Sequence, residues 1–542
     1  MQGMPIALHQ LPDDVDALKS LVVDQLVRNE QLQVDKQAVD QEIEQLTTEN
    51  QRYKFQVLTL TEQLNLALAR RYAASSEKLS PDQICLFDEA EFDGKEDAVA
   101  DASVEADDDE IMVAAHKRKK RGRKPIPDHL PRIDVIHELP ESERRCEHDG
   151  RLLREIGEVI SEQLDIIPAK IQVLRHIRKK YACDCGQCIK TAPLPAQPIP
   201  KSMASPGLLA HIAVCKYQDA LPLYRQETIL QRIGVDIPRA TLANWMIQAG
   251  HLIQPLINLL HERLLSYDIV QMDETTVQVL KEPGRRAQSK SYLWLQRGGP
   301  PDRPVVLFHY DPGRGAEVAK HLLEGFRGYL QTDGYDGYNA AVAENDLIHV
   351  GCMAHARRKF SDAVKAQGKN KKHGKAHRGL NLIRKLYRVE KTARKLKPEE
   401  RQAHRDRHAR PILDEMRTWL DQAMPQVPPT SATGTALHYL HNEWDKLIGY
   451  LDDGRLEIDN NLAENAIRPF VIGRKNWIFS NSVRGVKASA NLYSLIETAK
   501  ANGLEPYAYL RHLFAELPKA ETVDGIEALL PGTLKKDRIK IG

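Results

Sequence analysis

The chain reads Asp268-Ile269-Val270-Gln271-Met272-Asp273 at the start of its most regularly punctuated region, an apolar segment with strand character that ends in a carboxylate. A second segment, Gly328-Tyr329-Leu330-Gln331-Thr332-Asp333, ends in the same way. Glu464 stands in a helical pattern that follows the polar run Asp459-Asn460-Asn461. We predict that the fold brings together these three carboxylates, Asp273, Asp333 and Glu464, from distant parts of the chain.

The region from Tyr267 to Cys352 predicts three hairpin-linked strands, a helix, a strand, a helix and a strand. The predicted strands cover 268–279, 292–295, 305–310, 328–333 and 347–351, and the predicted helices cover 315–326 and 335–344. This is the element order of a ribonuclease H-like domain, in which the first and fourth strands are neighbours. We therefore predict an α/β fold with a ribonuclease H-like catalytic core that places Asp273 beside Asp333.

Three carboxylates that meet without cations repel one another, and hard divalent ions with oxygen ligands relieve this repulsion. Mg²⁺, or Mn²⁺ in its place, suits such a site because it binds through few carboxylates together with substrate phosphates. Two such ions stabilise the attacking and leaving oxygens of an in-line phosphoryl displacement. The predicted chemistry is metal-dependent phosphoryl transfer.

These acidic residues also have structural interpretations. An aspartate after a strand is common in turns, and Asp459 is a candidate cap of the helix that carries Glu464. Glu274 follows Asp273 and points to the opposite face of a strand. Further acidic candidates are Asp336, Asp346 and Glu457.

The 130 residues between Asp333 and Glu464 are more than the last connection of a compact domain needs. From Arg357 to Arg410 there are twenty Lys or Arg against five Asp or Glu, a net charge of +15. The pattern is helical, so we predict a basic helical insertion over 357–450 that contacts DNA phosphates. A solvated basic face is the alternative. The first candidate contacts are Arg357, Arg358 and Lys359.

Apolar residues recur every seven positions near the N-terminus, on one ladder from Leu11 to Leu60 and on another from Val15 to Leu64. Leu at one position with Val, Ile and occasional Asn at the other is typical of a parallel two-stranded coiled coil. A long amphipathic helix packed on its own domain is the alternative. We predict a coiled coil over 11–79 and, through it, a homo-oligomer.

The net charge of +2 hides an uneven distribution. The stretch from Asp88 to Glu110 has a net charge of −11, which leaves +13 for the rest of the chain and predicts a polyanionic partner. This stretch indicates a solvated acidic linker over 80–115. The basic run after it fits an A·T minor groove or phosphate contacts alone, and both interpretations predict DNA binding. Its candidate contacts are Arg121, Arg123 and Lys124.

Two clusters of soft ligands flank the 30 residues 151–180, which alternate like strands. Such a layout is typical of a structural Zn²⁺ site in a domain too small for its own core. We predict a basic arm and a zinc-finger-like DNA-binding domain over 116–200, with a metal-free knuckle as the alternative. The candidate zinc ligands are Cys146, His148, Cys183, Cys185 and Cys188, with Asp149 as a substitute for His148.

The remaining features bound the class of protein. Residues 201–262 read as helices, in which Leu223–Trp245 fits a helix-turn-helix or, equally well, two packed helices. Seven cysteines in a long, charged chain do not resemble a disulfide framework. The sequence has no apparent leader and no apolar stretch of membrane-spanning length, so we expect a cytoplasmic protein without a membrane partner.

Several motifs occur in an order that chance does not reproduce. They are Ser75-Ser76-Glu77-Lys78-Leu79, Glu162-Gln163-Leu164-Asp165, Gln271-Met272-Asp273-Glu274-Thr275, Thr332-Asp333-Gly334-Tyr335, Gly351-Cys352-Met353-Ala354-His355-Ala356-Arg357-Arg358-Lys359-Phe360, and Asp459-Asn460-Asn461 through Ile472-Gly473-Arg474-Lys475-Asn476-Trp477. Through these motifs the chain resembles the DDE transposases of the insertion sequence 66 family over almost its whole length.

The resemblance implies a DDE triad at Asp273, Asp333 and Glu464, divalent metal, and binding to the terminal inverted repeats of the element and to target DNA. It also implies that Cys352 and His355 belong to a family motif, for which we expect packing or DNA contact, since two ligands alone make a poor zinc site. Accessory proteins of the same element are candidate partners. Candidate phosphate contacts on or just beyond the Glu464 helix are Arg468, Arg474 and Lys475.

We therefore expect a DNA transposase that cleaves and transfers strands with metal. A catalytically silent DNA-binding protein derived from a transposase is one alternative, and a structure-specific nuclease of the same fold is another. The expected core occupies 263–356 and 451–518, and a tail covers 519–542.

Overall fold

The computed structural model describes residues 14–72, 171–182, 189–367 and 374–534. The chain divides into two units, 96–194 and the remainder. In the smaller unit, the described residues contain an antiparallel hairpin of β1 (Lys180–Ala182) and β2 (Ile189–Thr191). The candidate zinc ligands, the acidic linker and the basic arm lie outside the described residues.

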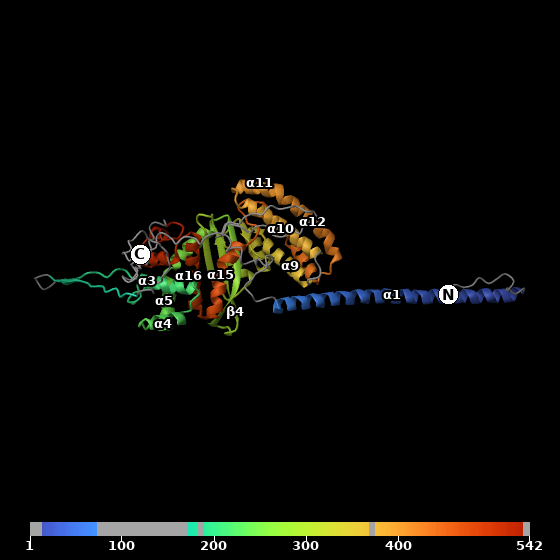
Figure 1. Cartoon of the computed structure of the whole chain (residues 1–542), viewed down its shortest axis with the longest axis horizontal. Helices are drawn as coiled ribbons and strands as arrows, with labels where there is room; N and C mark the ends of the chain where they lie inside the picture. The colour runs from blue at the N-terminus through green and yellow to red at the C-terminus, as the bar shows by residue number, and fades with distance from the viewer. Residues whose placement is uncertain (1–13, 73–170, 183–188, 368–373, 535–542) are drawn as a thin grey trace, which may run out of the picture. The chain divides into compact units, whose positions relative to one another are not determined.

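A mixed sheet forms the centre of the larger unit (Figure 1). Its strands are β3 (Ile269–Lys281), β4 (Lys290–Gly298), β5 (Val305–Asp311), β6 (Tyr329–Gln331), β7 (Ile348–Val350) and β8 (Ser480–Ser482). The spatial order is β5-β4-β3-β6-β7, with an antiparallel meander of β3, β4 and β5 and parallel pairing of β3 with β6 and of β6 with β7. β8 pairs in parallel with the far end of β3.

Helices cover this sheet because its strands are apolar on both faces. Leu293, Trp294 and Leu295 are consecutive in β4 and all fully buried, as expected for a strand without a solvent face. α15 (Asn461–Trp477) packs on β3 and β4, and α16 (Val483–Ala501) packs on β5. The predicted mixed α/β fold is confirmed.

The predicted elements occur in the predicted order; β3, β4 and β5 are longer than predicted, and the later elements are shorter. The helix predicted over 315–326 is α7 (Ala316–Leu322), and the fourth strand ends at Gln331, before Asp333. The helix predicted over 335–344 is a 3-10 turn, η4 (Asp336–Tyr338), followed by α8 (Asn339–Asn345). Asp346 ends α8 in the left-handed region, with φ of 52°.

Helices before and after the sheet pack on the same hydrophobic core. They include α3 (Pro206–Tyr217), α4 (Leu223–Arg232), α5 (Arg239–Leu252), α6 (Gln254–Leu265), α17 (Pro506–Glu516) and α18 (Val523–Glu527). α4 and α5 form the predicted helix pair. A Cβ at Gly250 would lie 2.5 Å from Cβ of Ala488, so α5 and α16 are in close contact.

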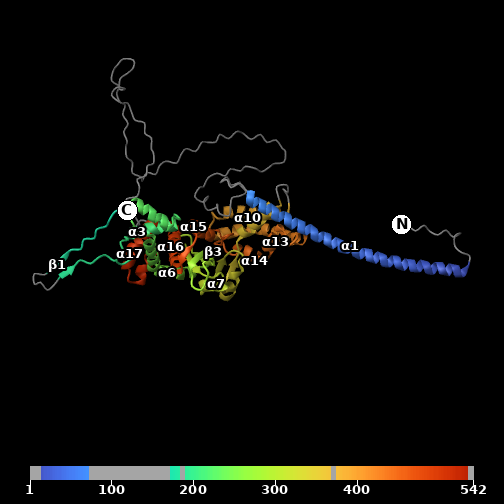
Figure 2. The ribbon, with the colours of Figure 1, turned by 90° about the horizontal axis from the view of Figure 1, so that it is seen from below.

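The insertion between β7 and α15 is helical throughout its described part and has a core of its own (Figure 2). Its elements are α9 (Met353–Ala366), α10 (Lys375–Ala393), α11 (Pro398–His408), α12 (Arg410–Ala423), η5 (Met424–Gln426), α13 (Ala432–Asn442), α14 (Trp444–Ile448) and η6 (Gly449–Leu451). Arg405 is fully buried in this core and donates to both carboxylate oxygens of Glu390, at 2.9 and 2.8 Å. Its Nη1 and Nη2 also donate to the carbonyls of Tyr450 and Leu456, so one arginine joins α10, α11 and the segment before α15.

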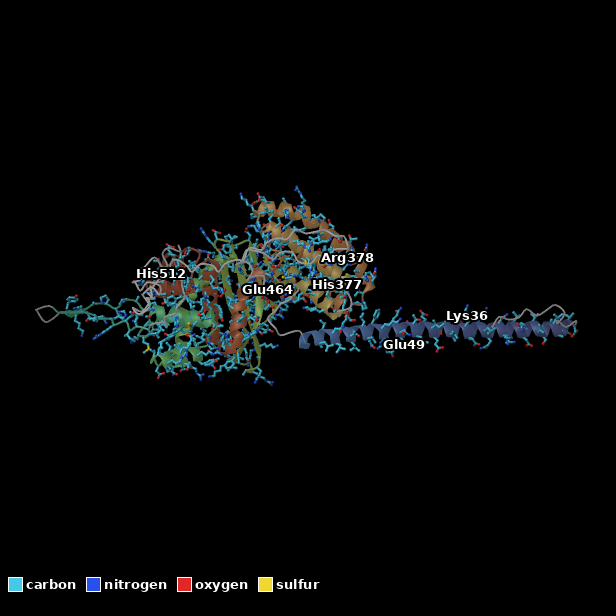
Figure 3. The ribbon with its side chains drawn as sticks, in the orientation of Figure 1. Lys36, Glu49, His377, Arg378, Glu464 and His512 are labelled. Atoms are coloured by element: carbon cyan, nitrogen blue, oxygen red, sulfur yellow. The ribbon has the colours of Figure 1, made fainter. Side chains whose placement is uncertain are left out.

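The N-terminal helix α1 (Val15–Tyr72) is a single uninterrupted helix of 58 residues. Most of the ladder residues that the structure describes are exposed in the single chain, for example Leu32 at 58% and Leu46 at 53%. Figure 3 shows side chains projecting from the helix along its length, with Lys36 and Glu49 labelled. Pairing of two such helices stays a prediction. Among the described helices, none has the length and apolarity to cross a membrane.

Candidate active site

Asp273, Asp333 and Glu464 come from three different elements. Asp273 lies within β3 opposite Leu295, Asp333 follows the end of β6, and Glu464 lies in the first turn of α15. Figure 3 labels Glu464 where α15 passes beside the sheet. Burial, followed by the negative charges of Glu274, Glu464 and Asp333, raises the pKa of Asp273 well above its usual value. The structure therefore gathers these carboxylates closely enough to disfavour one another's ionisation.

Glu464 is 8% exposed. Burial raises its pKa to about 7, the positive charge of Arg358 opposes this shift, and the negative charges of Asp459 and Asp333 add to it. Glu464 therefore holds its proton at higher pH than an ordinary glutamate does. A cation bound here would displace that proton.

Polar contacts fix the backbone beside the two aspartates. Nε2 of Gln271 donates to Oε1 of Gln331 at 2.7 Å, and Nε2 of Gln331 donates to the Glu457 carbonyl at 2.7 Å. Beyond β6, the backbone N–H of Tyr335 donates to Oδ1 of Asp333 at 3.0 Å. The buried amide pair locks the β3–β6 register, and the turn contact orients the Asp333 carboxylate.

Glu274 has polar partners of its own. Its Oε1 accepts bonds from Nε and Nη2 of Arg314 at 2.8 and 2.5 Å, and its Oε2 accepts a bond from the Tyr338 hydroxyl at 2.5 Å. The Arg314 guanidinium lies 3.8 Å from the ring centroid of Tyr335. Arg314 therefore connects the neighbour of Asp273 with the turn that follows Asp333. Sequence reasoning missed this arginine, which lies in a Gly-rich loop without a periodic pattern.

The start of α15 corrects the predicted cap. The N-cap is Asn460, while Asp459 lies one residue earlier and accepts bonds from the Asn461 N–H at 3.3 Å and from the Tyr387 hydroxyl at 2.9 Å. The prediction was wrong because α15 begins one residue later than the polar run suggested. Nδ2 of Asn460 donates to the Met272 carbonyl at 2.8 Å, which ties the helix start to the residue before Asp273.

Cys352 and His355 lie beside the same helix start. Cys352 is the N-cap of α9, is fully buried, and its Sγ accepts a bond from the Asn460 N–H at 3.3 Å. Nδ1 of His355 lies 3.7 Å from Oε1 of Glu464. Burial, followed by the charge of Arg358, lowers the pKa of His355. The motif pair thus contacts Glu464, a proximity that sequence spacing alone does not reveal.

The candidate DNA contacts that the structure describes fall on two helices. On α9, the Arg357 guanidinium lies 5.4 Å from the Tyr387 ring, Lys359 Nζ lies 4.8 Å from the Tyr439 ring, and the charge of Arg358 acts on Glu464. On α15, Arg468 also acts on Glu464 and Lys475 is exposed in the last turn. Arg474 differs from these residues, because its Nη1 donates to the hydroxyls of Thr275 and Thr276 on β3 at 3.2 and 3.1 Å.

Together these features define a class, an α/β protein in which a central sheet and one helix assemble a buried group of carboxylates. The profile described as "Transposase IS66 family" matches residues 201–488, more than half of the chain, and "IS66 C-terminal element" matches 494–531. "Transposase C of IS166 homeodomain" matches 59–135, and "zinc-finger binding domain of transposase IS66" matches 143–186. The chain belongs to the IS66 family of transposases, which are DNA-processing proteins.

The chain is also similar, over most of its length, to curated proteins of Sinorhizobium fredii (strain NBRC 101917 / NGR234). "Uncharacterized protein y4qI" is 32% identical over 549 residues, covering 99% of this chain and all of the relative. "Uncharacterized protein y4jD" is 35% identical over 429 residues, covering 76% of this chain and 82% of the relative. No solved structure matches the chain.

Proposed function

We propose that this protein is a DDE transposase that cleaves and joins DNA at Asp273, Asp333 and Glu464 on a ribonuclease H-like core. The observation that carries the proposal is the convergence of three carboxylates from β3, the end of β6 and α15, with the pKa of Asp273 raised well above its usual value by burial and then by its acidic neighbours. The strand order β5-β4-β3-β6-β7, with β4 antiparallel to its neighbours, supports the ribonuclease H-like assignment.

The donor set fits a hard divalent cation. It consists of carboxylate oxygens, and Oε1 of Glu464 is buried without a hydrogen-bond partner among the described residues. Asp273, Asp333 and Glu464 would hold Mg²⁺ or Mn²⁺, since these ions prefer oxygen ligands. When bound, such ions polarise the attacking oxygen and neutralise charge that develops on the phosphate.

The chain's own residues position the reacting groups. Asn460 holds the start of α15 against β3, and the Tyr335 N–H orients Asp333. Arg358 and Arg468 place positive charge beside Glu464, where a DNA phosphate would lie. In the first step, the oxygen of water would form a P–O bond while the bond from phosphorus to the 3′ oxygen breaks. The 3′ oxygen takes up a proton to give the 3′-OH of the element, and the flanking DNA keeps a 5′-phosphate. In the second step, that 3′-OH forms a new P–O bond with target DNA, and the displaced 3′ oxygen leaves with a proton.

Recognition of the terminal inverted repeats requires a larger surface than the triad. We assign it to the basic insertion, the zinc-finger-like unit and the basic arm, because phosphate contacts by Lys and Arg supply most sequence-independent affinity. Pairing of α1 with a second copy would hold two chains on two element ends. Accessory proteins of the same element would join this assembly.

A strand-transfer assay tests the proposal. Labelled DNA ends from the element, a target plasmid and Mg²⁺ or Mn²⁺ are incubated with the protein, and joined products are separated on a gel. Joining that disappears in Asp333→Asn supports the proposal. Binding to the repeats without any cleavage, even with accessory proteins supplied, favours a catalytically silent DNA-binding protein, and cleavage without joining favours a nuclease.

A further inference from the structure

Three donor atoms of different chemistry converge where α9 and α15 begin. Cys352 precedes α9, His355 lies in its first turn, and Glu464 lies in the first turn of α15. One sulfur, one imidazole nitrogen and one carboxylate oxygen from these residues all lie within 4.8 Å of one another. Zinc bonds of about 2.0–2.3 Å separate tetrahedral ligands by about 3.5 Å. The 3.7 Å between His355 Nδ1 and Glu464 Oε1 is already close to this separation.

Two of these donor atoms lack other partners. Oε1 of Glu464 and Nδ1 of His355 are buried and have no hydrogen-bond partner among the residues that the structure describes. The Glu464 residue is 8% exposed. Buried polar atoms nearly always have hydrogen-bond partners, so the nitrogen and the oxygen that face each other here without one require an explanation. A cation between them satisfies both.

Burial and the negative charges of Asp459 and Glu464 raise the pKa of Cys352 well above its usual value, so Zn²⁺ would have to displace the thiol proton to bind this sulfur. The Asn460 N–H donates to the Cys352 Sγ at 3.3 Å, and hydrogen bonds from the protein to a ligand orient it and tune its bond to the metal. A set of one sulfur, one nitrogen and one oxygen selects a thiophilic ion over Mg²⁺. Three protein ligands with a fourth position open are typical of zinc.

We propose that Cys352, His355 and Glu464 bind Zn²⁺, and that zinc held there withdraws Glu464 from the carboxylate triad. The second part rests on the proposed function. Zinc at this site would inhibit the reaction, because the carboxylate that binds Zn²⁺ is the one that α15 supplies to the triad.

Metal content tests the binding site independently of any reaction on DNA. The full chain is equilibrated with Zn²⁺, freed of unbound metal and measured by elemental analysis, together with Cys352→Ser, His355→Ala and Cys215→Ser. Cys215 is the half-buried free thiol of α3 and serves as the matched control. Zinc bound by the 143–186 unit is common to all four proteins and cancels in the comparison.

We expect wild type and Cys215→Ser to hold one zinc equivalent more than Cys352→Ser and His355→Ala. Replacement of zinc by Co²⁺ should give a thiolate charge-transfer band that is weaker in Cys352→Ser than in Cys215→Ser. Circular dichroism melting identifies any variant that fails to fold. If Cys352→Ser fails to fold, His355→Ala, at a half-buried residue, still tests the site. Equal zinc content in all four folded proteins overturns the site.

Strand transfer in Mg²⁺ with increasing Zn²⁺ tests the inhibition, with each protein's own zinc-free activity as its reference. We expect His355→Ala to raise the zinc concentration for half-inhibition at least about tenfold, which corresponds to one lost ligand of the site. Unchanged inhibition in a variant that has lost one zinc equivalent overturns the inhibitory role. If no protein transfers DNA under any condition, the proposed function fails while the zinc count still decides the site.

Discussion

Asp273 and Asp333 each lie two residues beyond a paired glutamine, Gln271 or Gln331; Asp273 is still within β3, and Asp333 lies just past the end of the parallel neighbour β6. Because successive side chains of a strand point to opposite faces, a slip of one residue would send one carboxylate away from the other. The buried amide bond between the two glutamines opposes such a slip. The positions of the two aspartates are therefore a property of the sheet register.

We predict that Asp333→Asn lowers strand transfer at least about 10³-fold, equivalent to about 4 kcal/mol of transition-state stabilisation. The substitution removes one negative oxygen ligand while it preserves size. The measurement is the initial rate of joining in Mg²⁺. Asp336→Asn, on the exposed neighbour in the 3-10 turn, is the control and should retain wild-type rates. Full activity in Asp333→Asn would end the triad assignment.

Divalent metal should stabilise the folded protein. A ligand at a hundred times its Kd adds about 2.7 kcal/mol to the free energy of unfolding. We therefore expect Mg²⁺ or Mn²⁺ to raise the thermal midpoint of the wild type and EDTA to reverse the effect. In Asp273→Asn the increase should be much smaller, as measured by differential scanning fluorimetry. An equal increase in both proteins would place the bound ion elsewhere.

We predict that Arg314 stabilises the fold through its ion pair with Glu274. Glu274 has a side chain only 3% exposed, so Arg314→Ala leaves a buried charge without its cation. Breaking a buried pair costs about 3–5 kcal/mol, but Arg314 itself is 41% exposed, so we expect a loss of about 2 kcal/mol. The double variant Arg314→Ala/Glu274→Gln should recover part of this loss in urea unfolding. Strict additivity of the two substitutions would show that the pair is not coupled.

We predict that low pH destabilises the insertion because it protonates the Glu390 carboxylate. Burial favours its protonation, but the hydrogen bonds and charges of Arg405 and Arg401 outweigh burial and lower its pKa below 4.5. A carboxylate with a lowered folded pKa contributes stability above its unfolded pKa and loses it as the pH falls below 4.5 through the folded value. Glu390→Gln should therefore be less stable than wild type at pH 7, and the difference should shrink below pH 4.5. Urea midpoints across this range provide the measurement, and a constant difference would contradict the linkage.

The exposed ladder on α1 should mediate self-association. Leu46→Glu would place two like charges against each other in a parallel pair, and we expect it to reduce the mass measured by light scattering toward that of one chain. Thr48→Glu adds the same charge on the opposite side of the helix and should leave the mass unchanged. A wild-type protein that is monomeric at micromolar concentrations would exclude pairing through α1.

The order of the core elements was predictable because strand periodicity and turn residues are local properties of the sequence. β3, β4 and β5 therefore appear where alternation and Gly- or Pro-rich turns place them. The bounds were less predictable, since β6 stops at Gln331 where the chain leaves its neighbours and not where apolar character ends. The same holds for α15, whose N-cap is Asn460 because this side chain bonds to Met272 of β3.

The sequence places the candidate carboxylates in or after strands and in the first turn of a helix, but it did not predict the contacts around them. Arg314 reaches Glu274 from 40 residues away, and His355 reaches Glu464 from another helix. Such pairs depend on tertiary packing, and a single sequence has no periodicity that records them. The sequence also suggested Arg474 as a phosphate contact, whereas its guanidinium bonds to threonines of β3.

The two hydrogen bonds of Asn460 have a mechanical consequence. Its backbone N–H bonds to Cys352 at the start of α9, and its side chain bonds to the β3 backbone beside Asp273. A single residue therefore bridges the first helix of the insertion and the strand at the centre of the sheet. Under the proposed contact of the insertion with DNA, a force that bends the bound DNA and pulls on the insertion would be transmitted through this residue to the helix that carries Glu464.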